Sequence, residues 1–368
     1  MKRFKHYIKE EAGFPVNKGH AYEFVLAAAM ISRFTDRYDD GTAMPVTPES
    51  VEAVMSNFFL SRAVWTVDSG DGVPDIVEFD GAGLPAEVIS AMRDKKLRSG
   101  SVVKQMVSDA INAVNKNRSL TTMATDVITN GKEDDVAVVC GGTTGQMDTK
   151  SDVDVYINGR EIRKVGFSVK YAGTKQAGQF AGVDPAKNLI DAFKSFDMDI
   201  SKLRSIKTID KVTSKLNPPY ASRQDPIIDK DKQTAFGAVH PLLREIGQKF
   251  GPKYMSQKKN AQAVMRGLLK ANIGKEDDVE LIRTSVSFDK KTFDAISTFV
   301  MDSAKKNQVS WKVLETGNPT IGFYAGGYEL FTVRFRYDAD RKKQGYMPRF
   351  RVYVENGKYL DTLAASIK

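Results

Sequence analysis

Apolar residues recur at helical spacing in the N-terminal third of the chain. A helix expected over residues 19–33 carries along one face Tyr22, Leu26, Met30 and Phe34. Similar stripes predict a helix that begins at Thr47-Pro48-Glu49 and another over residues 101–118. We interpret these stripes as core packing and expect a helical N-terminal region over residues 1–118.

The period of the pattern changes to two further along the chain. Short alternating runs predict strands over residues 136–140, 152–157 and 163–170, because successive side chains of a strand point to opposite faces. Each of the last two runs has an apolar face. The polar faces carry Asp152, Asp154 and Tyr156 in one run, and Gly166, Ser168 and Lys170 in the other.

The loop between these two strands decides which residues lie opposite each other. Asn158-Gly159 suggests a two-residue turn, but that turn would set Asp152 opposite the apolar Val165. Because a shift of one residue flips every side chain to the other face, we expect a loop of odd length instead. A five-residue loop over residues 158–162 puts Asp152 opposite Ser168, and a three-residue loop makes these two residues diagonal neighbours.

Helical and then extended patterns fill the rest of the chain. A helix begins at Asp184-Pro185, and Asn217-Pro-Pro219 indicates a linker. Helices are predicted over residues 232–249, 256–272 and 289–305, followed by strands over residues 308–314, 320–324, 328–337 and 347–355.

The last two predicted strands form a ribbon with one basic face. Alternation turns Phe331, Val333 and Phe335 inward on one strand and Phe350, Val352 and Val354 inward on the other. Arginines then share the outer face, and a basic loop joins the strands: Arg334, Arg336, Arg349 and Arg351, with Arg341, Lys342 and Lys343 in the loop. Such a ribbon suits contact with phosphates or entry into a nucleic-acid groove; a solvated sheet face is the alternative.

Length and composition narrow the class of protein. A chain of 368 residues with 41% hydrophobic residues is large enough for two lobes. The longest apolar run, Phe24 to Ile31, is far short of the roughly 20 residues of a membrane span, so we expect no membrane partner. No apolar signal region follows the basic N-terminus, and Cys140 is the single cysteine. We therefore expect a cytoplasmic protein without internal disulfides.

Charge is distributed unevenly along the chain. Residues 1–159 hold 17 basic and 23 acidic residues, a net charge of −6, while residues 160–368 hold 38 and 23, a net charge of +15. A basic half joined to an acidic half suggests a polyanionic partner, with nucleic acid as the first candidate.

The polar faces of the two central strands carry the candidate chemistry. Alternation places Asp152 and Asp154 beside Ser168 and Lys170 on one face. Hydrolysis of a phosphodiester needs a divalent cation that polarises the phosphate and lowers the pKa of the attacking water. Mg²⁺ prefers oxygen ligands such as carboxylates, and a nearby lysine stabilises developing negative charge.

The two strands resemble the PD-(D/E)xK nuclease superfamily, which includes many type II restriction endonucleases and phage nucleases. The residues that carry the resemblance are Lys150-Ser-Asp-Val-Asp-Val-Tyr-Ile157 and Gly166-Phe-Ser-Val-Lys170. The resemblance implies that Asp152 is the first metal ligand, with Asp154 as its substitute, that Val169 lends a backbone carbonyl, and that Lys170 is the catalytic lysine. The implied cofactor is Mg²⁺, with Mn²⁺ as the alternative.

The chain departs from the family pattern at Ser168, where the family has a second acid. The family often carries a glutamate on an N-terminal helix beside the sheet, and Glu23 in Gly19-His-Ala-Tyr-Glu23 is the candidate replacement. Related nucleases follow the lysine with a helix that bears glutamines, and Gln176 and Gln179 are similar to that feature. For Glu23 the alternative is a solvated helix residue. For Gln176 and Gln179 the alternative is that they are ordinary loop or cap residues.

These observations predict an α/β protein with a restriction-endonuclease-like mixed sheet flanked by helices, followed by a helical and β-ribbon C-terminal region. The expected parts are residues 1–118, a catalytic core over 119–215 and a basic nucleic-acid-binding region over 216–368. The expected function is Mg²⁺-dependent endonucleolytic hydrolysis of DNA, double-stranded in the first instance, by a monomer or a homodimer. The alternatives are a non-catalytic nucleic-acid-binding protein on a degenerate nuclease core, and a structural or assembly protein.

Overall fold

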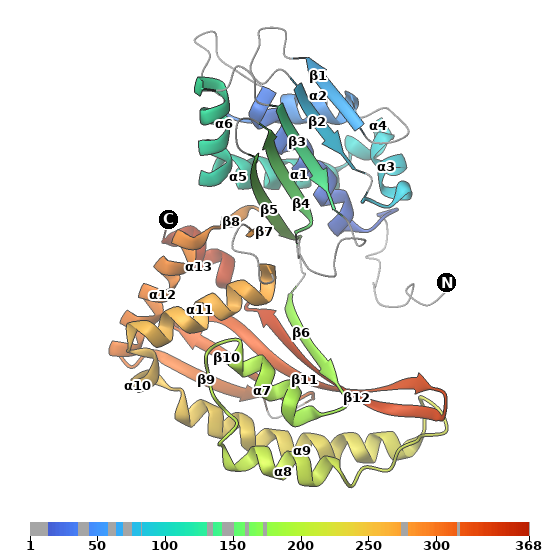
Figure 1. Cartoon of the computed structure of the whole chain (residues 1–368), viewed down its shortest axis with the longest axis vertical. Coiled ribbons are helices and arrows are strands. Elements are labelled where there is room, and N and C mark those ends of the chain that lie inside the picture. The colour runs from blue at the N-terminus through green and yellow to red at the C-terminus, as the bar shows by residue number, and fades with distance from the viewer. Residues whose placement is uncertain are drawn as a thin grey trace. The chain divides into compact units, whose positions relative to one another are not determined.

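The protein is a mixed α/β structure in two compact units (Figure 1). The computed structural model describes residues 14–35, 44–57, 64–68, 76–81, 83–130, 135–141, 151–158, 162–171, 175–273, 279–314 and 317–367. Unit 1 comprises Met1–Thr174 and Ile273–Asp289, and unit 2 comprises Lys175–Asn272 and Lys290–Lys368.

This division differs from the three regions expected from the sequence. The boundary at Thr174 cuts through the expected core over residues 119–215, and the Asn217-Pro-Pro219 segment lies inside unit 2 rather than between two parts. The physical reason is a long-range pairing: β7 (Val279–Arg283) returns to pair in parallel with β5 (Ile162–Lys170). Unit 2 is thus inserted in the sequence between two neighbouring strands of unit 1.

The sheet of unit 1 has the strand order β1-β2-β3-β4-β5-β7-β8. The pairs β2–β3 and β5–β7 are parallel, and the other pairs are antiparallel. The remaining strands are β1 (Val64–Asp68), β2 (Ile76–Asp80), β3 (Asp135–Cys140), β4 (Val153–Asn158) and β8 (Val286–Phe288). The helical region expected over residues 1–118 also contains two strands that the sequence analysis did not predict. β2 pairs with β3 and β1 pairs with β2, and local periodicity does not reveal such long-range pairing.

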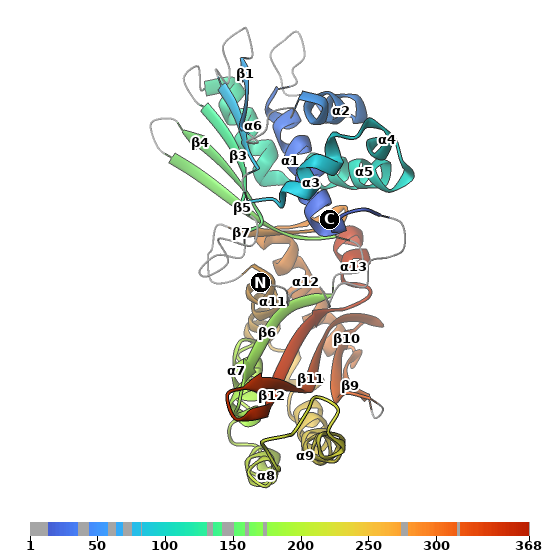
Figure 2. The same cartoon turned by 90° about the vertical axis from the view of Figure 1, so that its right-hand side faces the viewer.

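Helices of unit 1 lie on one side of this sheet (Figure 2). They are α1 (Lys18–Thr35), α2 (Pro48–Asn57), α3 (Ala86–Arg93), α4 (Lys95–Arg98), α5 (Ser101–Asn115) and α6 (Arg118–Asn130), which confirms the three helices expected from the apolar stripes. Helix α1 contacts α2, α5, β2 and β3, and it is buried all round from Ala21 to Phe34. A helix surrounded in this way is held in place by the whole core of the unit.

The register of β4 and β5 confirms the odd-length loop. Val153 pairs with Phe167, and Asn158 pairs with Ile162, so the loop shortens to residues 159–161, which lie outside the described residues. Asp152 directly precedes the first of these pairs, and its N–H donates to the Phe167 carbonyl at 2.8 Å. The two-residue turn is therefore excluded by the pairing.

Unit 2 is built on an antiparallel sheet with the strand order β6-β12-β11-β10-β9. The strands are β6 (Gln176–Gly182), β9 (Val309–Leu314), β10 (Thr320–Ala325), β11 (Tyr328–Lys342) and β12 (Gly345–Asn356). Seven helices accompany it in the described chain: α7 (Pro185–Lys194), α8 (Arg204–Thr213), α9 (Pro226–Lys249), α10 (Pro252–Met255), α11 (Lys258–Ile273), α12 (Lys290–Lys305) and α13 (Leu360–Ser366).

One face of the second sheet packs on α7, α9 and the segment that follows α7. Phe331 stacks on Phe196 at a centroid distance of 4.8 Å, and Phe335 meets Phe236 at 6.1 Å. The inward-facing aromatic residues predicted for the ribbon are therefore core residues. The opposite face carries the arginines.

Two glycines inside helices of unit 2 differ in their surroundings, because Gly267 is tightly packed and Gly237 has open space around it. Substitutions at these two positions test the packing of unit 2. A Cβ on Gly267 of α11 would meet the backbone of Ser195 and would lie 2.8 Å from the Phe196 Cα atom, whereas a Cβ on Gly237 of α9 meets nothing within 4 Å. We expect Gly267→Ala to lower the free energy of unfolding by about 1–3 kcal/mol. Gly237→Ala should raise it by up to about 1 kcal/mol. Urea denaturation followed by circular dichroism measures both, and equal effects would contradict the packing.

The charge imbalance follows the structural units. Unit 1 holds 23 basic and 29 acidic residues, and unit 2 holds 32 and 17, so the net charges are −6 and +15. The basic charge thus belongs to a separately folded unit with its own sheet. Among the described residues no helix is both long and apolar enough to cross a membrane.

Candidate functional site

The Asp152 carboxylate is the centre of the candidate site at the end of β5. Asp152 directly precedes β4, and its Oδ2 atom accepts the Val169 N–H at 2.6 Å. The Ser168 hydroxyl lies 3.5 Å from the same oxygen, and the Lys170 ammonium lies 3.8 Å from it. The structure therefore brings Asp152, Ser168 and Lys170 together, as the strand register predicts.

Glu23 reaches the same place from α1. Its side chain is buried, with an exposed fraction of 7%, and its Oε2 atom has no hydrogen-bond partner among the described residues. Burial raises the pKa of Glu23 to about 8, the charge of Asp152 adds to this rise, and Lys170 opposes it. The Glu23 carboxyl group is therefore within electrostatic influence of the Asp152–Lys170 pair.

The carboxyl groups of Asp152 and Glu23 and the ammonium group of Lys170 thus lie in a largely buried part of unit 1. Burial also raises the pKa of Asp152, against the opposing effects of Lys170, the Val169 N–H, Ser168 and His20. Two neighbouring carboxyl groups with one ammonium group carry more negative charge than the site compensates when both are ionised. Such an excess of negative oxygen ligands favours a cation.

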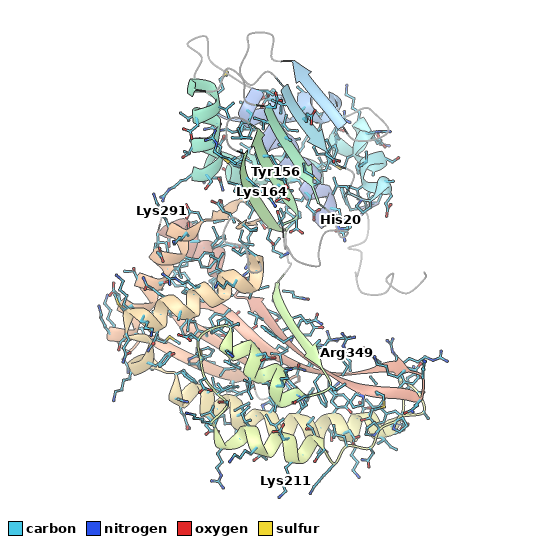
Figure 3. All side chains as sticks on the ribbon, in the orientation of Figure 1. His20, Tyr156, Lys164, Lys211, Lys291 and Arg349 are labelled. Carbon is cyan, nitrogen blue, oxygen red and sulfur yellow. The ribbon has the colours of Figure 1, made fainter. Side chains whose placement is uncertain are left out.

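The sequence reasoning missed His20. This residue lies three positions before Glu23, close to one turn along α1, where side chains share a face, and Figure 3 shows it at the N-terminal end of α1. Burial lowers the pKa of His20, while Asp152 and Glu87 raise it. The spacing of three residues between His20 and Glu23 could have indicated that both belong to the site. A single histidine on a helix expected to pack in the core did not by itself point to a functional role.

Asp154 has a different environment from Asp152. Its Oδ1 atom accepts the Ser151 hydroxyl at 2.6 Å, and its Oδ2 atom lies 3.5 Å from the Lys164 ammonium and from the Tyr156 hydroxyl. Figure 3 shows Tyr156 and Lys164 on the strands β4 and β5. A Cβ at Gly166 would lie 2.7 Å from both Asp154 Oδ1 and Ser151 Oγ, so this glycine leaves room for the network.

The donor set for a metal is smaller than the sequence implied. No group of three His, Cys, Asp or Glu side chains among the described residues is arranged to hold an ion. Asp152 and the unpartnered Glu23 oxygen fit a hard cation in their chemistry, whereas Asp154 is engaged by Lys164. The Val169 backbone contributes its N–H to Asp152, and its carbonyl as a ligand stays a prediction. Ser168 is fully buried and stands close to Asp152 without replacing the missing charge.

The glutamines expected beside the lysine lie elsewhere. Gln176 and Gln179 are exposed residues of β6, an edge strand of the unit 2 sheet, so the expected glutamine-bearing helix is wrong. The strand forms because residues 176–182 pair with β12, a partner far away in the sequence.

The basic ribbon has the predicted faces but a different charge balance. Register places Arg336 opposite Arg351 and Arg334 opposite Tyr353 on the face away from the core. Acids of the same face compensate these arginines through ion pairs: Arg334–Glu355, Arg336–Asp338, Arg351–Asp338 and Arg349–Asp340. Because β11 continues to Lys342, Arg341 and Lys342 belong to a strand rather than to the loop, and only Lys343 lies in the turn.

The acidic partners were visible in the sequence. Asp338 and Asp340 continue the alternation of Arg334 and Arg336, but the predicted strand ended at residue 337. The hairpin extends further because β11 and β12 pair with each other up to Lys342 and Gly345.

Compared with known families, curated proteins and solved structures, the chain matches none of them. The function must therefore be argued from the site itself.

Proposed function

We propose that this protein is a Mg²⁺-dependent endonuclease that hydrolyses phosphodiester bonds of DNA on a restriction-endonuclease-like core. The observation that carries the proposal is the ion pair of Asp152 with Lys170 at the end of β5, with the buried Glu23 of α1 within electrostatic influence of both residues. The resemblance to PD-(D/E)xK nucleases predicts these three residues in these three places. A chance pattern in the sequence gives no reason for a helix glutamate to lie within electrostatic influence of the pair.

Asp152 and Glu23 are the residues that would hold the divalent cation. The unpartnered Glu23 oxygen supports this assignment. Burial raises the pKa of both carboxyl groups, and a bound cation would offset the cost of keeping them ionised there. When bound, Mg²⁺ supplies polarisation of the phosphate and a water of lowered pKa. Mn²⁺ has similar ligand preferences and is the alternative.

The chain's own residues position and stabilise the reacting groups. Lys170 places a positive charge 3.8 Å from the Asp152 carboxylate, where it can stabilise the negative charge that develops on the phosphate. The Val169 N–H fixes one Asp152 oxygen, so the second oxygen is available to a cation. His20 adds a titratable group beside Asp152.

Unit 2 supplies the charge that a DNA partner requires. Its net charge of +15 favours double-stranded DNA as a polyanion that it attracts, and the ribbon offers a narrow surface for a groove. A homodimer would provide two copies of the site, one for each DNA strand.

Digestion of plasmid DNA tests this proposal. We expect nicking or linearisation in Mg²⁺ and complete loss of cleavage in EDTA. The variant Asp152→Asn should lose at least about 100-fold in rate, because it removes the ligand charge at the centre of the site. Wild-type cleavage in EDTA, or an unchanged rate for Asp152→Asn, would contradict the proposal.

A non-catalytic DNA-binding protein is the second candidate. The observation that favours it is the buried Ser168 in place of a second acid, together with the lack of three clustered ligands among the described residues. Salt-sensitive binding of DNA without cleavage in either Mg²⁺ or Mn²⁺ would support this candidate. Absence of salt-sensitive DNA binding would instead favour the structural or assembly protein.

A further inference from the structure

The hairpin of β11 and β12 extends beyond the rest of the second sheet (Figure 1). The pairing of β10 with β11 ends at Thr320↔Arg334, and the pairing of β6 with β12 ends at Phe350↔Gly182. Beyond these pairs, β11 and β12 pair with each other as far as Lys342 and Gly345, with one added bridge between Tyr220 and Tyr346 in the described chain. The result is a projecting two-stranded ribbon.

One face of this ribbon carries an alternating ladder of charges. Asp338 lies 3.6 Å from Arg336 and 2.6 Å from Arg351, and Asp340 lies 3.5 Å from Arg351 and 2.6 Å from Arg349. Three arginines and two aspartates leave this ladder with a net charge of +1. The ladder is therefore poorly suited to neutralising DNA phosphates, because the affinity gained from phosphate contacts depends on positive charge that is not already paired.

Arg349 is the end of the ladder that remains open. Its side chain is 43% exposed, against 16% for Arg351 in the middle, and Figure 3 shows it on the ribbon. Its Nη1 atom donates to Asp340, and its other guanidinium nitrogens have no partner among the described residues. Although burial of Asp340 acts in the opposite direction, Arg349, Arg351 and Arg223 hold the pKa of Asp340 below its usual value, so the aspartate stays ionised and keeps Arg349 oriented.

An oriented arginine with free donors is suited to a base edge. Arginine reads guanine with two hydrogen bonds, to O6 and N7, and the major groove is wide enough for a two-stranded ribbon. Holding the guanidinium in place beforehand reduces the entropy lost on binding. A flexible, uncompensated lysine contacts phosphates instead. Lys342 and Lys343 at the tip have no acidic partner among the described residues.

We propose that this face of the ribbon enters the major groove of duplex DNA, where Arg349, held by Asp340, reads a guanine. The inference rests on the proposed DNA partner but not on cleavage. In this proposal the charge ladder reads a base, and the lysines at the tip contact phosphates. The protein is then selective for a DNA sequence that contains guanine.

Selection from duplexes with a randomised centre tests the proposal, using the full chain in EDTA and in Ca²⁺ so that cleavage plays no part. We expect the wild type to enrich a motif with a fixed guanine. Arg349→Lys keeps the charge but loses the planar fork, so it should lower discrimination at one guanine position by about tenfold or more while the average affinity for the pool changes little.

Two further variants separate the roles of charge and orientation. Asp340→Asn leaves Arg349 in place but uncovers its charge, so we expect weaker guanine discrimination together with a steeper salt dependence, by about one phosphate contact. Lys342→Ala is the matched control on the same ribbon. It should weaken binding to all sequences equally and reduce the salt slope by about one, with the enriched motif unchanged.

Several results would overturn the proposal. These are DNA binding without any enriched guanine, an equal loss for all sequences in Arg349→Lys, or a changed motif in Lys342→Ala. Thermal melting of each variant distinguishes these results from misfolding, and Asp340→Asn provides a second test if Arg349→Lys does not fold. Failure of the endonuclease proposal appears separately, as selective binding without cleavage in Mg²⁺.

Discussion

Replacement of Lys170 by alanine is expected to reduce DNA cleavage in Mg²⁺ by about 100- to 1000-fold. The reason is the loss of the positive charge that lies 3.8 Å from Asp152 at the end of β5. Because Lys170 belongs to the candidate reaction centre of unit 1 and the ribbon belongs to unit 2, binding of DNA should be retained. Rates of plasmid digestion and fluorescence anisotropy with labelled duplex in EDTA measure the two effects.

Lys164 provides the matched control for this variant. It lies on the same strand and forms an ion pair with an aspartate of the preceding strand, Asp154, at 3.5 Å. Lys164→Ala should therefore change cleavage by no more than about threefold, since the loss of a partly exposed ion pair has a small effect. Equal losses in both variants would show that the Asp152 site has no special role.

Replacement of Glu23 by glutamine is expected to stabilise the protein at alkaline pH while it abolishes cleavage. The folded-state pKa of Glu23 is about 8, above its ordinary value of 4.5. The folded state therefore binds more protons than the unfolded state between these values, so the stability of the wild type falls as pH rises through this range. Glutamine is neutral at every pH and removes this loss.

The measurement compares melting in EDTA at about pH 4 and about pH 9. At the lower pH the carboxyl group is protonated in both states, and the two proteins should have similar stability. At the higher pH the variant should be more stable, on the order of 5 kcal/mol. Glu78→Gln removes an exposed carboxylate of β2 and should show no such dependence. A variant that is less stable than the wild type at the higher pH would contradict the buried, uncompensated position of Glu23.

The comparison of β6 with β4 and β5 shows why sequence reasoning succeeded in one place and failed in another. The β4–β5 pair is local: alternation defines both faces, and parity then restricts the loop. The pairing of Val153 with Phe167 is one of the two registers that those two facts leave open. In contrast, Gln176 to Gly182 is a short run with two glycines, and only the distant β12 makes it a strand.

The central helix and the two faces of the ribbon follow from the sequence alone, which also restricts the hairpin to two registers. These depend on periodicity and on side-chain direction, which are local properties of the backbone. It also determined which residues could meet: Asp152, Ser168 and Lys170 on neighbouring strands.

The surroundings of these residues depend on the tertiary structure. Burial of α1 turned Glu23 into an uncompensated acid beside Asp152 and added His20, while Lys164 and Tyr156 drew Asp154 into a separate network. The return of β7 to β5 divided the chain into its two units, and the extended hairpin placed Asp338 and Asp340 among the arginines. Desolvation and charge pairing depend on neighbours that are distant in the chain, so periodicity alone does not reveal them.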